Sequence, residues 1–125
     1  MKDIENRDDL LLMMQRFYDR LLADPSINYI FTDVAKIDLV PHLHILVDFW
    51  DMVLFQADTY RKNVLQLHLD LNRETSLSKE HFETWLGHFN ATVNELFDGD
   101  KAFMAKERAK SIATVMRIKI AQLKQ

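Results

Sequence analysis

The feature that most constrains the fold of this chain is its small number of helix-breaking residues. Only two glycines and two prolines occur in 125 residues. A fold made of many short strands needs frequent tight turns, which these residues form most readily. The sequence therefore favours an all-α chain of long helices. Its length suits a single domain, residues 1–125, that can bury a sizeable core.

The remaining composition excludes several classes of protein. The net charge is −3, and apart from a modest cluster between Lys101 and Lys124 the basic residues are dispersed, so we expect no nucleic-acid partner. Cysteine is absent, which excludes disulfides, thiolate metal sites and thiol nucleophiles. The first residues carry charge too early for a signal peptide, and no apolar run is long enough to span a membrane. We therefore expect a cytoplasmic protein with no membrane partner.

Apolar residues recur at helical spacing in four segments. The first helix is predicted over about 8–22, with INYIF (27–31) as a separate turn after it. The second is predicted from a cap at Asp38 to about Phe55, and the third from Ser78 to about Leu96. After the turn FDGD, a fourth helix continues to the end. A short segment is also expected at about 60–67.

Each predicted helix has an apolar face that we expect to point inward. These faces are Leu10, Met13 or Met14, Phe17 and Leu21 in the first helix; His42, Ile45, Leu46, Phe49 and Val53 in the second; Phe82, Leu86, Phe89, Val93 and Leu96 in the third; and Phe103 or Met104, Ala109, Ile112, Met116 and Ile120 in the fourth.

His68 stands out because it lies in VLQLHLDL, among four leucines and a valine. A buried imidazole without partners for its ring nitrogens costs roughly 2–7 kcal/mol. Something must therefore face it, either a carbonyl in the core or a metal ion. Taken alone, a hydrogen-bonded core histidine is the commoner case.

Other conspicuous side chains also have ordinary interpretations when each is taken alone. Trp50 and Trp85 would fill the core, and Tyr18 would be half-buried with its hydroxyl at the surface. His81 and His88 are seven residues apart, too far to share one ion without other ligands, so we expect them on the solvent side. No glycine-rich phosphate loop, H-E-x-x-H, G-x-S-x-G or close carboxylate pair is present, so a hydrolase or a kinase is not indicated.

Five segments taken together favour a different interpretation of these residues. In this order and spacing, RFYDRLLADPSINYIF, PHLHILVDFWDMVL, LQLHLDL, HFETWLGHFNATVNELF and AKERAKSIATVMRIKI resemble the group III truncated haemoglobins. The resemblance extends from about Leu11 to Ala121. It implies the truncated globin fold, a helical sandwich around a pocket for haem b.

The resemblance also implies how the haem is held. His68 matches the proximal histidine that ligates haem iron. Phe31 matches the phenylalanine that packs on the haem face, Leu46 would complete the ceiling of the pocket, and Leu67 belongs to the apolar wall around the histidine. Charged residues such as Arg61 and Lys62 could pair with the haem propionates.

On the opposite side of the haem, the resemblance implies a distal pocket for a diatomic ligand such as O2, CO or NO. Tyr18 matches the distal tyrosine, and Trp85 matches the distal tryptophan, whose indole N–H can only donate. His42 matches the histidine of the distal helix, and because it follows Pro41 it falls in the first turn of that helix. Trp50 would pack behind the distal helix.

Three functions of different classes fit these residues. The first is a haem protein that binds O2 or another diatomic ligand reversibly. The second is a haem-dependent redox enzyme, peroxidase-like or NO-detoxifying, that is served by an unidentified reductase. The third is a haem-free helical regulatory module that keeps only the fold. Retention of His68, Tyr18 and Trp85 together argues against the third.

Overall fold

The computed structural model describes residues 1–58 and 77–123, and all regular structure within these ranges is helical, as predicted. Leu67, His68 and the predicted segment 60–67 lie outside the described residues. No helix in the described ranges is both long and apolar enough to cross a membrane. The elements are α1 (Arg7–Leu22), η1 (Ile30–Val34), α2 (Leu39–Phe55), α4 (Lys79–Leu96) and α5 (Asp100–Leu123).

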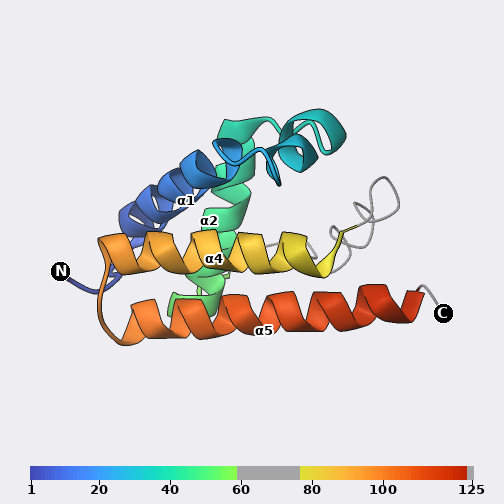
Figure 1. The fold of residues 1–125 in the computed structure, drawn as a ribbon. Coiled ribbons are helices and arrows are strands. Elements are labelled where there is room, and N and C mark those ends of the chain that lie inside the picture. Colours follow the sequence, from blue (N-terminus) through green and yellow to red (C-terminus); the bar gives the residue numbers. More distant parts are fainter. Residues whose placement is uncertain (59–76, 124–125) are drawn as a thin grey trace.

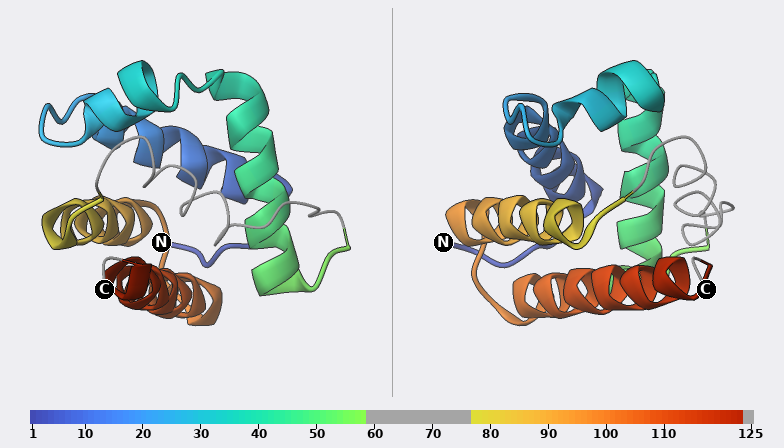
Figure 2. Two further views of the ribbon diagram at one scale, coloured as in Figure 1. Left: turned by 90° about the vertical axis from the view of Figure 1, so that its right-hand side faces the viewer. Right: turned by 45° about the vertical axis from the view of Figure 1, so that its right-hand side comes forward.

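The long helices pack as two pairs (Figures 1 and 2). Helices α4 and α5 run antiparallel beside one another, and α1 lies across α4. Helix α2 packs against α1 and reaches α5 near its own C-terminal end. The core lies where these elements meet, because each helix turns one apolar face towards the others.

Helix α1 forms where the periodicity predicts it. The Asn6 side chain accepts a hydrogen bond from the Asp9 backbone N–H at 3.0 Å, and the acidic residues of the first turn favour a helix N-terminus. The face predicted to point inward is confirmed as buried, including both candidate methionines: Leu10, Met13, Met14, Phe17 and Leu21.

Helix α2 begins after Asp38, as predicted, although the Asp38 side chain makes no capping bond. Its predicted inward face is largely wrong. Only Phe49 of that face is buried, and the remaining residues are half-buried. The core is instead contacted by the neighbouring face, made of Leu43, Val47, Trp50 and Leu54. Nearly all of α2 is apolar, so periodicity alone could not distinguish the two faces.

Helix α5 also differs in part from the prediction. Ala109, Met116 and Ile120 are buried as expected, but Phe103 and Met104 are exposed. The inward positions of the first turns are occupied by alanines, Ala102, Ala105, Ala109 and Ala113. These small side chains allow α5 to pack closely against its neighbours, which a hydrophobicity pattern that favours large residues does not indicate.

The start of the chain is fastened to the start of α5. The carboxylate of Asp3 accepts backbone N–H groups of Lys101 at 2.9 Å and Ala102 at 2.8 Å. The Lys2 carbonyl accepts the N–H of Asp98 at 3.0 Å. Gly99 has φ +147°, and a Cβ at this position would lie 2.5 Å from Cγ of Asp3. A residue 98 positions away therefore caps α5.

Candidate functional site

Tyr18 is the central polar group of the site. It lies on the core side of α1 with only 4 % of its surface exposed. Its hydroxyl is 2.7 Å from Nε2 of His42, on the first turns of α2. The interpretation that this hydroxyl is at the surface is therefore wrong. Two residues that the resemblance assigns to the distal pocket form a hydrogen-bonded pair.

The chemistry of the pair indicates which group donates. Burial raises the pKa of Tyr18 well above its usual value, so the side chain remains a neutral phenol. A phenol is a better proton donor than a neutral imidazole N–H, and an imidazole nitrogen is the better base. We therefore infer that Tyr18 donates its O–H to Nε2 of His42, which leaves the imidazole proton on Nδ1.

Trp85 comes from the first half of α4 and is half-buried. Its ring meets Phe17 edge-on at 5.7 Å and stacks on Phe89 at 6.0 Å, and Trp50 stacks on Phe89 at 5.0 Å. Trp50, predicted to pack behind the distal helix, lies buried among these rings. Within the described part of the chain, no residue accepts a hydrogen bond from the Trp85 indole N–H. Trp85 therefore retains a donor, whereas the proton of Tyr18 is engaged.

Apolar side chains surround these donors. Phe31 in η1 meets the ring of Tyr18 edge-on at 5.5 Å, and Phe17 meets the same ring from within α1 at 5.5 Å. Leu46 is half-buried one turn after His42 on α2. The structure thus places both His42 and Phe31 against Tyr18 and connects Trp85 to Tyr18 through Phe17. His68, Leu67, Arg61 and Lys62 lie outside the described residues.

Two histidines make interactions that the sequence prediction missed. His81 accepts the Ser78 backbone N–H at Nδ1 (3.1 Å), and its Nε2 is 2.9 Å from the Tyr29 hydroxyl. His88 is 2.7 Å from the carboxylate of Asp24. The expectation that both histidines face solvent is therefore wrong, since both are half-buried. Only the first had a local signal, because a polar side chain three residues after Ser78 is the pattern of a capping box.

Within the described residues, neither histidine belongs to a metal cluster. Across residues 1–58 and 77–123, no three His, Asp or Glu side chains are placed so that they could share a metal ion. The hydrogen bond from His88, followed by those from Ser26, lowers the pKa of Asp24 to about 2. The His88–Asp24 pair thus joins α4 to the segment after α1.

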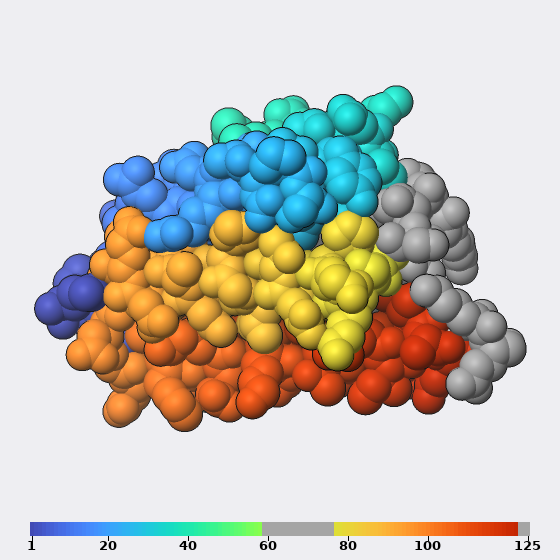
Figure 3. Space-filling model, in the orientation of Figure 1, coloured from blue at the N-terminus to red at the C-terminus, as the bar shows by residue number. Residues whose placement is uncertain are grey.

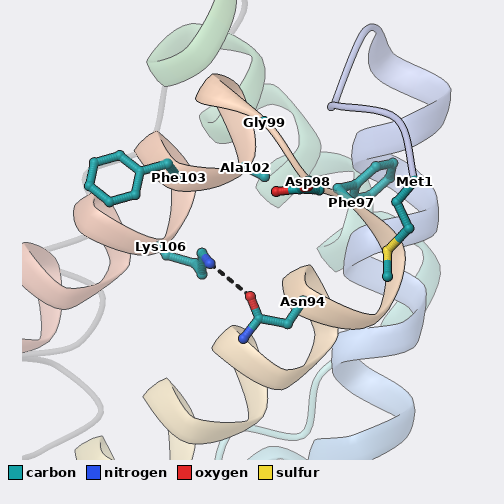
Figure 4. Close-up of a pocket in the computed structure, with 8 residues that line it drawn as sticks. All are labelled: Met1, Asn94, Phe97, Asp98, Gly99, Ala102, Phe103 and Lys106. Carbon is teal, nitrogen blue, oxygen red and sulfur yellow. Dashed lines mark hydrogen bonds between the residues drawn. The ribbon is translucent and has the colours of Figure 1, made fainter.

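A hollow of about 300 Å³ lies between the N-terminus, the end of α4 and the start of α5 (Figure 4). A hydrogen bond of 2.7 Å from Nζ of Lys106 to Oδ1 of Asn94 crosses its wall. None of the predicted site residues lines this hollow, so we do not assign the diatomic ligand to it.

The architecture is the truncated globin fold, as predicted. The crystal structure of a group III truncated haemoglobin from Campylobacter jejuni matches with a TM-score of 0.84, covering 96 % of this chain and 95 % of that one at 24 % identity. In sequence, a group 3 truncated haemoglobin of Campylobacter jejuni is 25 % identical over 112 aligned positions, and the match covers 87 % of this chain and 86 % of that protein. No protein-family model matches the chain. The resemblance indicated by the five segments is confirmed.

Proposed function

We propose that this chain is a haem protein that binds O2 or another diatomic ligand. The observation that carries the proposal is the polar group Tyr18, His42 and Trp85, set among aromatic rings within a truncated globin fold. The Tyr18–His42 hydrogen bond joins α1 to α2, but a buried polar pair with an unused indole donor nearby offers more polar groups than this packing needs. It suits a pocket in which a small polarised ligand must be hydrogen-bonded.

The described apolar faces fit a haem. Porphyrin is a flat, largely apolar group and needs apolar walls. Apart from the buried Phe49, the face of α2 that was predicted to enter the core is half-buried, including Leu46 and Val53. Phe31 and Trp85 are half-buried as well. These side chains, together with Leu67 in the proposal, would contact the macrocycle, and haem b suits a chain without cysteine because it needs no covalent attachment.

His68 is the proposed iron ligand. The family resemblance and its apolar neighbours in the sequence support this assignment. Haem would supply an iron that binds diatomic ligands, and the His68 imidazole would hold that iron. The remaining chemistry belongs to the distal residues, which donate hydrogen bonds to the ligand and exclude water from it.

The distal residues would have unequal roles. Trp85 is the donor that needs no rearrangement, because its N–H is unengaged within the described part of the chain. Tyr18 can turn its proton to the ligand only by giving up His42. His42 would act on the ligand through Tyr18, as a positioning residue. The same donors would polarise O2 or peroxide in the alternative function, a redox enzyme that draws electrons from a reductase.

The optical spectrum tests the proposal. Purified protein reconstituted with haem should show a histidine-ligated ferrous spectrum that changes when CO is added. His68→Ala should abolish the five-coordinate histidine spectrum, whereas His44→Ala, an exposed position on α2, should leave it intact. An unchanged spectrum in His68→Ala would show that another residue binds iron.

Thermal melting separates the haem protein from the haem-free module. Haem that binds only the native state adds stability by mass action, so the apo form should melt well below the holo form. Equal melting temperatures, with no spectral change on adding haem, would favour the haem-free module. Turnover with peroxide, or with NO and a reductant, would favour the redox enzyme. The cytoplasmic location stays a prediction.

A further inference from the structure

The outer face of α5 carries large apolar side chains exposed to solvent. Phe103 is 61 % exposed, Met104 42 %, Val115 48 % and Ile118 53 %. At about 100° per residue, these four positions fall within an arc of about 120° on the helix. The buried residues of α5, from Ala102 to Ile120, lie on the opposite side. This exposed arc, hereafter the outer face, also holds Glu107, Ser111 and Thr114, so it is a partly apolar second side of a helix whose inner side already fills the core.

Cations border the outer face along both edges. Lys110 and Arg117 lie beyond one edge and Arg108 and Lys119 beyond the other, each within about 40° of it by the same helical geometry. All four are exposed, and none has an ion-pair partner within the described residues. Helix α5 has six basic and two acidic residues, a net charge of +4, in a chain whose net charge is −3.

The outer face can meet a flat surface along its length. Helix α5 forms one whole edge of the molecule, as Figure 3 shows in orange to red. From Phe103 to Ile118 the helix rises about 22 Å at 1.5 Å per residue. Side chains at both ends of this stretch can therefore reach the same plane.

We infer that α5 docks this protein onto the surface of an anionic phospholipid bilayer. Exposed apolar side chains between two rows of cations characterise helices that lie in the membrane interface, with apolar groups below the headgroups and cations on the phosphates. A second copy of the chain fits less well, because two-fold pairing of this face would bring unpaired cations against cations. The expectation of no membrane partner was based on the absence of a span, which surface docking does not require.

Glu107 lies within the arc and is exposed. Its carboxylate is repelled by anionic headgroups and resists burial, so it separates Phe103 and Met104 from Val115 and Ile118. Docking is therefore shallow, through the two apolar ends. The position also provides a direct test, because Glu107→Gln should strengthen binding to anionic vesicles.

Co-sedimentation of the haem-reconstituted protein with vesicles tests the inference. The protein should bind phosphatidylcholine vesicles that contain phosphatidylglycerol, bind pure phosphatidylcholine much less, and be released by salt. Each of Lys110→Gln and Arg117→Gln should weaken binding about fivefold, the effect of one cation near an anionic surface. Phe103→Ser should also weaken binding. Val40→Ser, at a 64 % exposed position on α2, is the matched control and should have no effect.

Three results would overturn the inference. The first is no binding to vesicles, which is also expected if the outer face instead receives an acidic protein, or equal binding to both kinds of vesicle. The second is a Val40→Ser variant that weakens binding as much as Phe103→Ser does. The third is a dimer, detected by sedimentation equilibrium without lipid, that Phe103→Ser dissociates, because the outer face would then be covered by a second copy. The substituted positions are exposed, and circular dichroism verifies that each variant is folded.

Discussion

Replacing His42 with leucine should slow the dissociation of O2 if the proposed function is correct. The Tyr18 hydroxyl lies 2.7 Å from Nε2 of His42, and in the inferred arrangement it donates its proton to that nitrogen. A ligand that accepts this proton must therefore replace an existing hydrogen bond. His42→Leu replaces the competing acceptor with an apolar side chain, so the Tyr18 hydroxyl becomes available to the ligand.

The magnitude follows from the bond that is removed. A neutral intramolecular hydrogen bond contributes about 0.5–1.5 kcal/mol, and this is the free energy that the ligand no longer has to overcome. At 1.4 kcal/mol for each factor of ten, O2 dissociation should slow by about two- to twelvefold. Trp85→Phe should instead speed dissociation by about ten- to a hundredfold, because it removes a donor that the ligand uses without competition.

The assay is stopped-flow displacement of O2 by CO in a double-mutant cycle. The slowing caused by His42→Leu should vanish in a Tyr18→Phe background, since the hydroxyl that was released is then absent. His44→Leu, an exposed position on the same helix, is the control and should leave the rate unchanged. If His42→Leu speeds O2 dissociation to the same extent with and without Tyr18, then His42 itself donates to the ligand, and the inferred direction of the bond is wrong.

Three further predictions concern stability, measured by urea or thermal unfolding. Gly99→Ala should destabilise the fold by about 1–3 kcal/mol, because φ is +147° and the added Cβ would lie 2.5 Å from Cγ of Asp3. The control, Gly87→Ala, should stabilise α4 by up to about 1 kcal/mol, because nothing lies within 4 Å of the added Cβ. Similar effects of the two substitutions would contradict the role of Gly99. Asp3→Ala should cost about 1–2 kcal/mol at pH 7. Burial raises the pKa of Asp3, but three backbone N–H donors outweigh burial and lower the pKa in the folded state. The stability that the Asp3 carboxylate contributes is therefore complete above the unfolded pKa of about 3.9 and should disappear as the pH falls through the lower folded pKa. A difference in stability between Asp3→Ala and the original protein that does not depend on pH would refute the explanation. Asp24→Asn should lower the melting temperature at pH 7, because His88 and Ser26 favour the ionised carboxylate of Asp24. The difference in melting temperature from the original protein should be lost as the pH falls from about 4 towards the folded pKa of about 2. Equal melting temperatures at pH 7 would show that the His88–Asp24 pair contributes nothing to stability.

Much of the fold was predictable because its causes are local. Few helix breakers, helical apolar spacing and the cap at Ser78 determine α1, α2 and α4 within a few residues. The resemblance carried by five segments in order identified the truncated globin fold. It also singled out Tyr18 and His42, although no spacing rule places residues on two helices within 2.7 Å of each other.

The tertiary structure decided which apolar face is covered, and by what. Periodicity shows that a helix has an apolar side, but it contains no information on the partner that packs there. For this reason α2 turns Leu43 and Val47 to the core instead of the face with Leu46, and α5 turns alanines inward and leaves Phe103 exposed. The same holds for contacts between distant residues, such as His88 with Asp24 and Asp3 with the first turn of α5. A short-range pattern cannot encode them, because they exist only once the helices are packed together.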